Sequence, residues 1–86
     1  MKKIWADKAW EDYLYWQDNN VKQVKKINKM LKEIDRHPFE GTGHPEPLKH
    51  EKKGYWSRHV TKEDRLVYRI KDNCIEIAQC RAHYDD

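Results

Sequence analysis

Apolar side chains recur at helical spacing over the first part of the chain. Before residue 18 they follow the i, i+3, i+4, i+7, i+8 pattern of one helix face: Ala6, Ala9, Trp10, Tyr13 and Leu14. Asp7 is the expected N-cap, because its carboxylate can accept a hydrogen bond from the free backbone N–H groups of the first turn. We predict a helix that begins near Asp7, buries this stripe and ends at the polar run 18–20.

A second helical stripe follows and predicts a second helix that ends at Pro38. Its apolar members are Val21, Val24, Ile27, Leu31 and Ile34, with Met30 beside them. Lysines occupy much of the remaining surface: Lys22, Lys25, Lys26, Lys29 and Lys32. Proline has no backbone N–H and clashes with the preceding turn, so the helix cannot continue through it.

After Pro38 the apolar period changes from 3.6 to 2, which is typical of strands. The expected strands are Lys2–Trp5, ahead of the first helix, and then Tyr55–Thr61, Arg65–Ile70 and Cys74–Tyr84. Short connections between the last three suit hairpins. We therefore predict a single α+β domain over residues 1–86, with two N-terminal helices packed on one face of a twisted antiparallel sheet.

The last predicted strand does not alternate cleanly. Ala78, Cys80 and Ala82 would face the helices, whereas Ile75 and Ile77 fall on the other side. We expect either a β-bulge or a strand that leaves the cover of the helices at one end.

Composition agrees with one small folded domain in a reducing compartment. The 86 residues are 37% hydrophobic and 38% charged, and four Trp and five Tyr supply apolar area for a modest core. Cys74 and Cys80 would lie about 20 Å apart on one strand, too far for a disulfide, so we expect free thiols and a cytoplasmic location. No membrane span or signal peptide is predicted.

The net charge of +3 is only mildly basic, which is compatible with a nucleic-acid partner without requiring one. The charge is unevenly distributed, because the segment 21–31 contains four Lys and no acid. A lysine-rich helix face is most often simply solvated. The alternative is contact with an anionic surface, and the candidates for it are Lys22, Lys25, Lys26 and Lys29.

With both helices on one face of the sheet, the other face is open for function. Alternation places Arg65 on this open face, and His83 on the same side of the last strand. Two prolines bracket Glu46, and proline in sheets is largely confined to edges. We therefore expect the segment with Glu46 and Lys49 to border the open face as an edge strand.

These groups could cleave RNA by internal transfer. Such a reaction needs a base for the 2′-hydroxyl, cations for the charge that grows on the phosphate, and an acid for the departing 5′-oxygen. Glu46 could be the base and His83 the acid. Arg65 could grip the phosphate through two hydrogen bonds, and Lys49 could add a point charge.

Spacing alone does not select this chemistry, since an exposed Glu, a terminal His and a strand-end Arg each have an ordinary structural explanation. Trp56 and Tyr84 offer aromatic faces on which bases could stack. His44 and His50 lack a metal-ligand spacing, so we expect neither a metal nor a cofactor.

The whole chain resembles the YoeB toxins of the RelE superfamily. Five stretches carry the resemblance: DYLYWQ at 12–17, KKIN at 25–28, PFEGTGHPEPLKH at 38–50, GYWSRHVTKEDRLVY at 54–68 and CRAHY at 80–84. They occur in order over nearly all 86 residues.

The resemblance implies a toxin of a type II toxin–antitoxin pair with a fold like that of microbial ribonucleases. Such toxins bind the ribosome and cut mRNA in the A site, and a YefM-type antitoxin covers them. The family pattern implies Glu46 as base, His83 as acid and Arg65 at the phosphate, with Lys49 and Tyr84 at the substrate. A homodimer is a further candidate assembly.

Two departures from the family pattern bear on activity. His59 stands where relatives commonly have a second arginine beside Arg58, which is itself a candidate substrate contact. Asp85 and Asp86 extend the chain past the His-Tyr pair, and their charges could raise the pKa of His83 or repel phosphate. The alternatives to an endoribonuclease are a translation inhibitor that binds the ribosome or RNA without cutting, and a partner that only binds an antitoxin and its operator complex.

Overall fold

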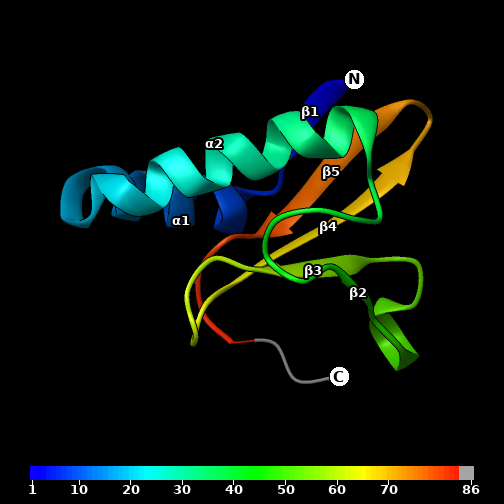
Figure 1. Cartoon of the computed structure of the whole chain (residues 1–86). Helices are drawn as coiled ribbons and strands as arrows, with labels where there is room; N and C mark the ends of the chain where they lie inside the picture. The colour runs from blue at the N-terminus through cyan, green and yellow to red at the C-terminus, as the bar shows by residue number, and fades with distance from the viewer. Residues whose placement is uncertain (84–86) are drawn as a thin grey trace.

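A computed structural model describes residues 1–83 and arranges them as two helices over a five-stranded sheet (Figure 1). The elements are β1 (Lys2–Trp5), α1 (Asp7–Asn19), α2 (Val21–Arg36), β2 (Glu46–Pro47), the short 3-10 helix η1 (His50–Lys52), β3 (Trp56–His59), β4 (Arg65–Lys71) and β5 (Cys74–Gln79). The predicted α+β class, with both helices on one face of the sheet, is confirmed. Within the described part of the chain, no helix is both long and apolar enough to cross a membrane.

The sheet has the order β1-β5-β4-β3-β2. The pairs β2–β3, β3–β4 and β4–β5 are antiparallel as predicted, but β1 pairs parallel to β5. A parallel neighbour requires a long crossover connection, and most of the chain separates β1 from β5. The N-terminal strand therefore joins the sheet at the edge away from β2.

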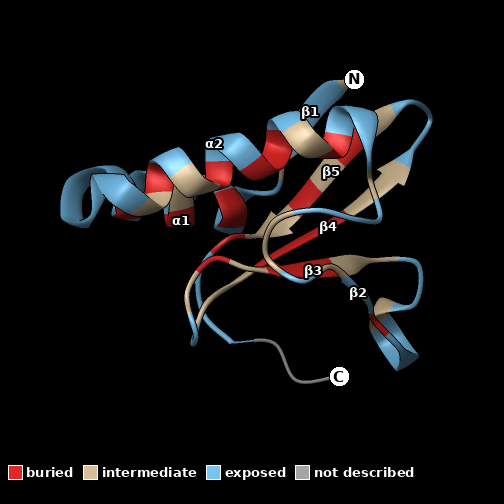
Figure 2. Ribbon diagram, viewed as in Figure 1, coloured by how far each residue is buried: buried red, intermediate tan, exposed pale blue. Residues whose placement is uncertain are grey.

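The core lies between α2 and the sheet, where the buried side of α2 faces β4 and β5 (Figure 2). The helix contributes Val24, Ile27, Met30, Leu31 and Ile34, and the sheet contributes Leu66, Tyr68, Ile75 and Ile77. The predicted stripe of the second helix is thus confirmed except at its first residue, Val21, which is 61% exposed.

The predicted buried face of α1 is only partly right. Ala9 and Trp16 are buried, while Trp10 and Leu14, which belong to the predicted stripe, are exposed. The helix turns a polar residue, Asp12, toward the interior instead, because the Asp12 carboxylate accepts a hydrogen bond from the backbone N–H of Cys80 at 3.0 Å. The N-cap is Ala6 rather than Asp7, which is the first helical residue.

A β-bulge in β5 resolves the irregular alternation of that strand. Tyr68 pairs with Ile77 and Val67 pairs with Gln79, so Ala78 is an extra residue opposite the Val67–Tyr68 step. The extra residue shifts the alternation by one, which allows both Ile77 and Cys80 to be buried on the helix side. The bulge that we considered from the sequence is confirmed.

The last strand is shorter than predicted, because it ends at Gln79 rather than Tyr84. Ala82 has a φ of 80°, which is not strand geometry, and its N–H donates to Asp64 Oδ1 at 2.8 Å. Simple alternation therefore does not place His83, and that part of the prediction is wrong.

Candidate active site

Glu46 lies on β2, the edge strand, as the flanking prolines predict. It pairs with Ser57 of β3, so its side chain is on the open face of the sheet, opposite the helices. The next backbone N–H along the edge, that of Leu48, donates to the Tyr55 carbonyl at 2.9 Å. Pro47 has no backbone N–H to donate, but the strand pairing continues on both sides of it, so Glu46 is held beside β3.

His59 stands between Glu46 and Arg65 on the middle strand of the open face. It lies two residues beyond Ser57, the partner of Glu46, and it pairs directly with Arg65 of β4. Its backbone N–H donates to the Gly43 carbonyl at 2.6 Å, which fixes the loop ahead of Glu46 to β3.

His44 completes this group of side chains. Its Nε2 lies 3.6 Å from Glu46 Oε1, and its ring meets the His59 ring edge-on with the centroids 6.1 Å apart. Burial lowers the pKa of His59, and the charge of Arg65 lowers it further, against the opposing charge of Glu46. His59 is therefore a neutral imidazole near pH 7.

Arg65 is anchored by backbone groups. Its Nη1 donates to the carbonyls of Thr61, Lys62 and Asp64 at 3.3, 3.0 and 3.2 Å. Among residues 1–83 it forms no ion pair with a carboxylate. No carboxylate of the described residues therefore neutralises this guanidinium on the open face, where a phosphate could approach.

The C-terminal segment brings His83 next to Arg65. The backbone N–H of Arg65 donates to the carbonyl of Ala82 at 3.0 Å, and the Gln79 amide donates to the same carbonyl at 3.2 Å. His83 follows directly in the chain and is exposed. Lys49, also exposed, follows the edge strand at the other side of this face. Tyr84, Asp85 and Asp86 lie outside the described residues.

Arg58 is a correction to the predicted site. Its side chain is fully buried on the helix side, and all its N–H donors have acceptors. Nε donates to the Tyr68 hydroxyl at 3.2 Å, and Nη1 donates to Glu33 Oε1 at 2.9 Å. The remaining bonds go to loop carbonyls, those of Thr42, His37 and Glu40. Arg58 therefore holds the loop between α2 and β2 and does not contact a substrate on the open face.

Trp56 is a second correction. It lies two residues before Arg58, on the same side of β3, where its ring packs on Phe39 with the centroids 4.7 Å apart and borders the core. The indole thus lies on the helix side and offers no stacking surface on the open face.

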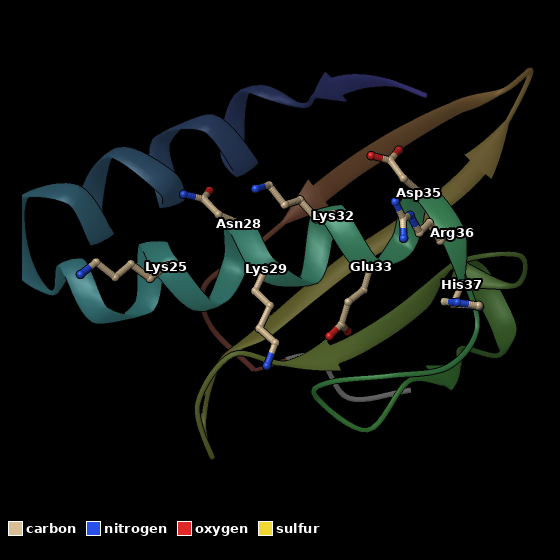
Figure 3. Close-up of a pocket in the computed structure, with 8 residues that line it drawn as sticks. All are labelled: Lys25, Asn28, Lys29, Lys32, Glu33, Asp35, Arg36 and His37. Atoms are coloured by element: carbon tan, nitrogen blue, oxygen red, sulfur yellow. The ribbon is translucent and has the colours of Figure 1, made fainter.

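The cationic face of α2 contains a surface pocket that is separate from the open face (Figure 3). Its cations are Lys25, Lys29, Lys32 and Arg36. Its two acids are occupied elsewhere, since Glu33 pairs with Arg58 and Asp35 pairs with Lys3 and the N-terminus. Within residues 1–83, none of the four cations forms an ion pair, so this face has a strong positive excess.

The lysines of the predicted surface on α2 differ in their exposure. Lys25 and Lys29 line this pocket, and Lys22 is exposed one turn earlier. Lys26 is half-buried, and its charge contributes to the lowered pKa of His59. Of the four lysines of the predicted surface, Lys26 is therefore the one that is not fully exposed.

Other chemistry is sparse over the described residues. Both cysteines are free thiols, and burial raises the pKa of Cys80 to about 12, so it is an unreactive group. Within residues 1–83, no three His, Cys, Asp or Glu side chains are arranged to hold a metal ion.

Sequence reasoning missed His44 and Asp64 as members of this region. Alternation from Glu46 could not place His44, because His44 lies ahead of β2 and its φ of 55° is left-handed rather than extended. Asp64 left no signal either, because its contact with Ala82 depends on the turn of the chain after β5.

Comparison with known proteins gives the family. The model of the YoeB-like toxin of bacterial type II toxin–antitoxin systems matches residues 5–84. The toxin YoeB of Escherichia coli strain K12 is 55% identical over 84 residues, which cover 98% of this chain and 100% of that protein. A YoeB–YefM complex from Staphylococcus aureus has a YoeB-like fold with TM-score 0.90 and 50% identity, and a YoeB dimer from the same organism has TM-score 0.91 and 49% identity, each covering 98% of both chains. The chain therefore belongs to the YoeB-like toxins of bacterial type II toxin–antitoxin systems.

Proposed function

We propose that this toxin is a ribosome-dependent endoribonuclease that cuts mRNA in the A site and so stops translation. The observation that carries the proposal is the placement of Glu46 and Arg65 on one open face, with β3 between them and His83 next to the Arg65 backbone. Two strand spacings separate β2 from β4 by about 10 Å, which leaves room for a phosphodiester between the side chains.

The proposed reaction is attack of a 2′-hydroxyl on the adjacent phosphorus. Glu46 takes the proton of the 2′-hydroxyl, and Arg65 and Lys49 stabilise the charge that develops on the phosphate. His83 gives a proton to the departing 5′-oxygen as its bond to phosphorus breaks. The products are a 2′,3′-cyclic phosphate and a 5′-hydroxyl. Proton transfer and electrostatic stabilisation are sufficient for this step, so it needs no bound metal.

Dependence on the ribosome follows from the weak net charge and its distribution. A free ribonuclease needs a strongly basic surface of its own, whereas this chain has a net charge of +3. The cations of α2 are gathered on a face away from the site, where they can meet ribosomal RNA while the open face holds mRNA.

The partners follow from the same family. We propose that a YefM-type antitoxin binds this chain, as in the Staphylococcus aureus complex, and that two copies can form a homodimer, as in the Staphylococcus aureus dimer. A toxin that acts on ribosomes works in the cytoplasm, where both free thiols also stay reduced.

Primer extension on mRNA from translating ribosomes tests the proposal. The wild-type chain should give discrete cuts in A-site codons, and Glu46→Gln and His83→Gln should each reduce the single-turnover rate by about 10²–10⁴. The rate should follow a bell-shaped pH profile, with Glu46→Gln removing mainly the acidic limb. Ribosome binding with no cut at any pH would instead support a non-cleaving inhibitor. Wild-type cleavage by both variants would refute the acid–base assignment.

A further inference from the structure

The residue that faces the site from β3 is His59, not Arg58. Arg58 is buried on the helix side with its donors satisfied, and side chains alternate along a strand, so the next residue must point to the open face. His59 there pairs with Arg65 and lies between it and Glu46. Any phosphate gripped by Arg65 and reached by Glu46 would pass over this imidazole.

We propose that His59 and Arg65 together bind the scissile phosphate, and that His59 takes up a proton from solvent when the phosphate binds. The inference rests on the proposed function and deepens it, since it assigns a second phosphate contact to this site. It also makes the binding of RNA depend on pH through a group that is neither the proposed base nor the proposed acid.

The charges around His59 explain the proton uptake. Arg65 from β4 and Lys26 from α2 oppose protonation, as do burial and the His44 ring ahead of β2, and only Glu46 from β2 favours it. A bound phosphate adds negative charge beside the imidazole and neutralises the field of Arg65. The pKa of His59 must therefore rise on binding. RNA must then bind more tightly as the pH falls through the interval between the pKa of His59 in the RNA complex and its pKa in the free chain.

The first experiment observes His59 without requiring cleavage. The imidazole signals of the full chain are followed by NMR from pH 5 to 8, alone and with a short RNA whose cleavable 2′-hydroxyl is replaced by hydrogen. The titration midpoint of His59 should rise by about one pH unit with RNA, as expected for an opposite charge at close range. The midpoint of His37, which lies at the C-cap of α2, serves as the control. A shift at His37 with none at His59 would place the RNA on α2 and overturn the proposal.

The second experiment measures cleavage on programmed ribosomes between pH 6 and 8. The quantity compared is the concentration of programmed ribosomes at which the cleavage rate is half-maximal. For the wild type it should increase with pH by up to about tenfold per unit, the limit for one proton. His59→Gln should flatten this dependence, and His59→Arg should hold the value low throughout, while the limbs assigned to Glu46 and His83 remain.

The two experiments separate the possible failures. If no variant cleaves but the His59 midpoint rises with RNA, the phosphate contact stands and the proposed reaction falls. Suppose instead that the wild type cleaves and that the half-maximal concentration depends on pH as strongly for His59→Gln as for the wild type. The phosphate contact is then overturned and the reaction stands. Should the RNA fail to bind the free chain, the ribosome measurement decides alone by the same criterion.

Discussion

The Arg58 side chain shows how one buried residue can organise the approach to the site. Its guanidinium joins α2, β4 and the loop 37–42 through five acceptors, and it is fully buried. The ammonium of lysine keeps the charge but cannot reach these acceptors in the same geometry. The loop that leads to Glu46 therefore depends on arginine at this position.

Arg58→Lys should lower the free energy of unfolding by about 3–5 kcal/mol, the usual cost of breaking a buried ionic network. Urea denaturation measures it, and Arg36→Lys, at an exposed position on α2, is the matched control and should change it by less than about 0.5 kcal/mol. Equal urea midpoints for wild type and Arg58→Lys would show that this network adds little to stability.

Glu33 is the charged partner of Arg58 and predicts a pH dependence of stability. Burial pushes the pKa of Glu33 upward, but hydrogen bonds from Thr42 and the interaction with Arg58 outweigh it, and the net shift is downward. A folded pKa below the unfolded value of about 4.3 gives stability that is complete above that value and is lost as the pH falls through the folded pKa.

Glu33→Gln should therefore be less stable than wild type at pH 7 and should lose less stability between about pH 5 and 2. Some acid dependence should remain, because Asp35 also has a lowered pKa through Lys3 and the N-terminus. Urea unfolding at each pH measures both chains, with the exposed Glu40→Gln as control. An acid slope in Glu33→Gln as steep as that of wild type would contradict the assignment.

At the scale of elements, α1 anchors the segment that leads to His83. Asp12 accepts the backbone N–H of Cys80, and the Trp16 indole donates to the Cys80 carbonyl at 2.9 Å. The Arg81 guanidinium then lies over the Tyr15 ring at 3.6 Å. The helix thus fixes the two residues that follow β5, immediately ahead of Ala82 and His83.

Asp12→Ala should loosen this segment. It leaves the buried Cys80 N–H without an acceptor, at a cost of about 1–3 kcal/mol, so hydrogen exchange of that amide should accelerate by roughly 10- to 100-fold. NMR hydrogen exchange measures it, and Asp18→Ala, exposed near the end of α1, is the control. Cleavage should slow because His83 loses its anchor. An unchanged exchange rate at Cys80 would show that other contacts hold the segment.

At the scale of the whole molecule, charge is divided between two surfaces. The open face holds Glu46, His59 and Arg65, and the cationic face of α2 carries Lys25, Lys29, Lys32 and Arg36. This separation allows docking and chemistry to be altered independently.

Replacing Lys25, Lys29 and Lys32 by Glu should weaken ribosome binding and reduce its salt dependence, since each lost phosphate contact removes about 0.7–0.9 from the slope of log K against log salt. Sedimentation with ribosomes at several salt concentrations measures it. The matched control makes the same charge change at exposed lysines elsewhere, Lys2, Lys53 and Lys71. If both triple variants bind equally, net charge rather than the α2 face governs docking.

Local pattern was sufficient wherever a residue's environment depends on its near neighbours in the chain. The 3.6 period fixed the core face of α2, the 2.0 period fixed that of β4, and the prolines placed Glu46 at a sheet edge. For the same reason Arg65 was predicted on the open face and the Glu46 segment at its border, and the strand pairing of the structure brings both residues to that face.

Contacts between distant segments decided the rest. Asp12 and Cys80 are 68 positions apart, and their hydrogen bond turns α1 away from the face that its apolar residues suggest. The bulge at Ala78 and the end of β5 at Gln79 likewise follow from pairing with β4 and from the hold of Asp64 on Ala82. Arg58 and His59 are adjacent, and the sequence alone could not say which one serves the site. The hydrogen-bond acceptors of Arg58 come from residues spread over 33–68. A buried guanidinium must have acceptors for its N–H donors, and only the assembled fold brings these acceptors together. The tertiary structure therefore decided that Arg58 is buried and that His59 lies on the open face.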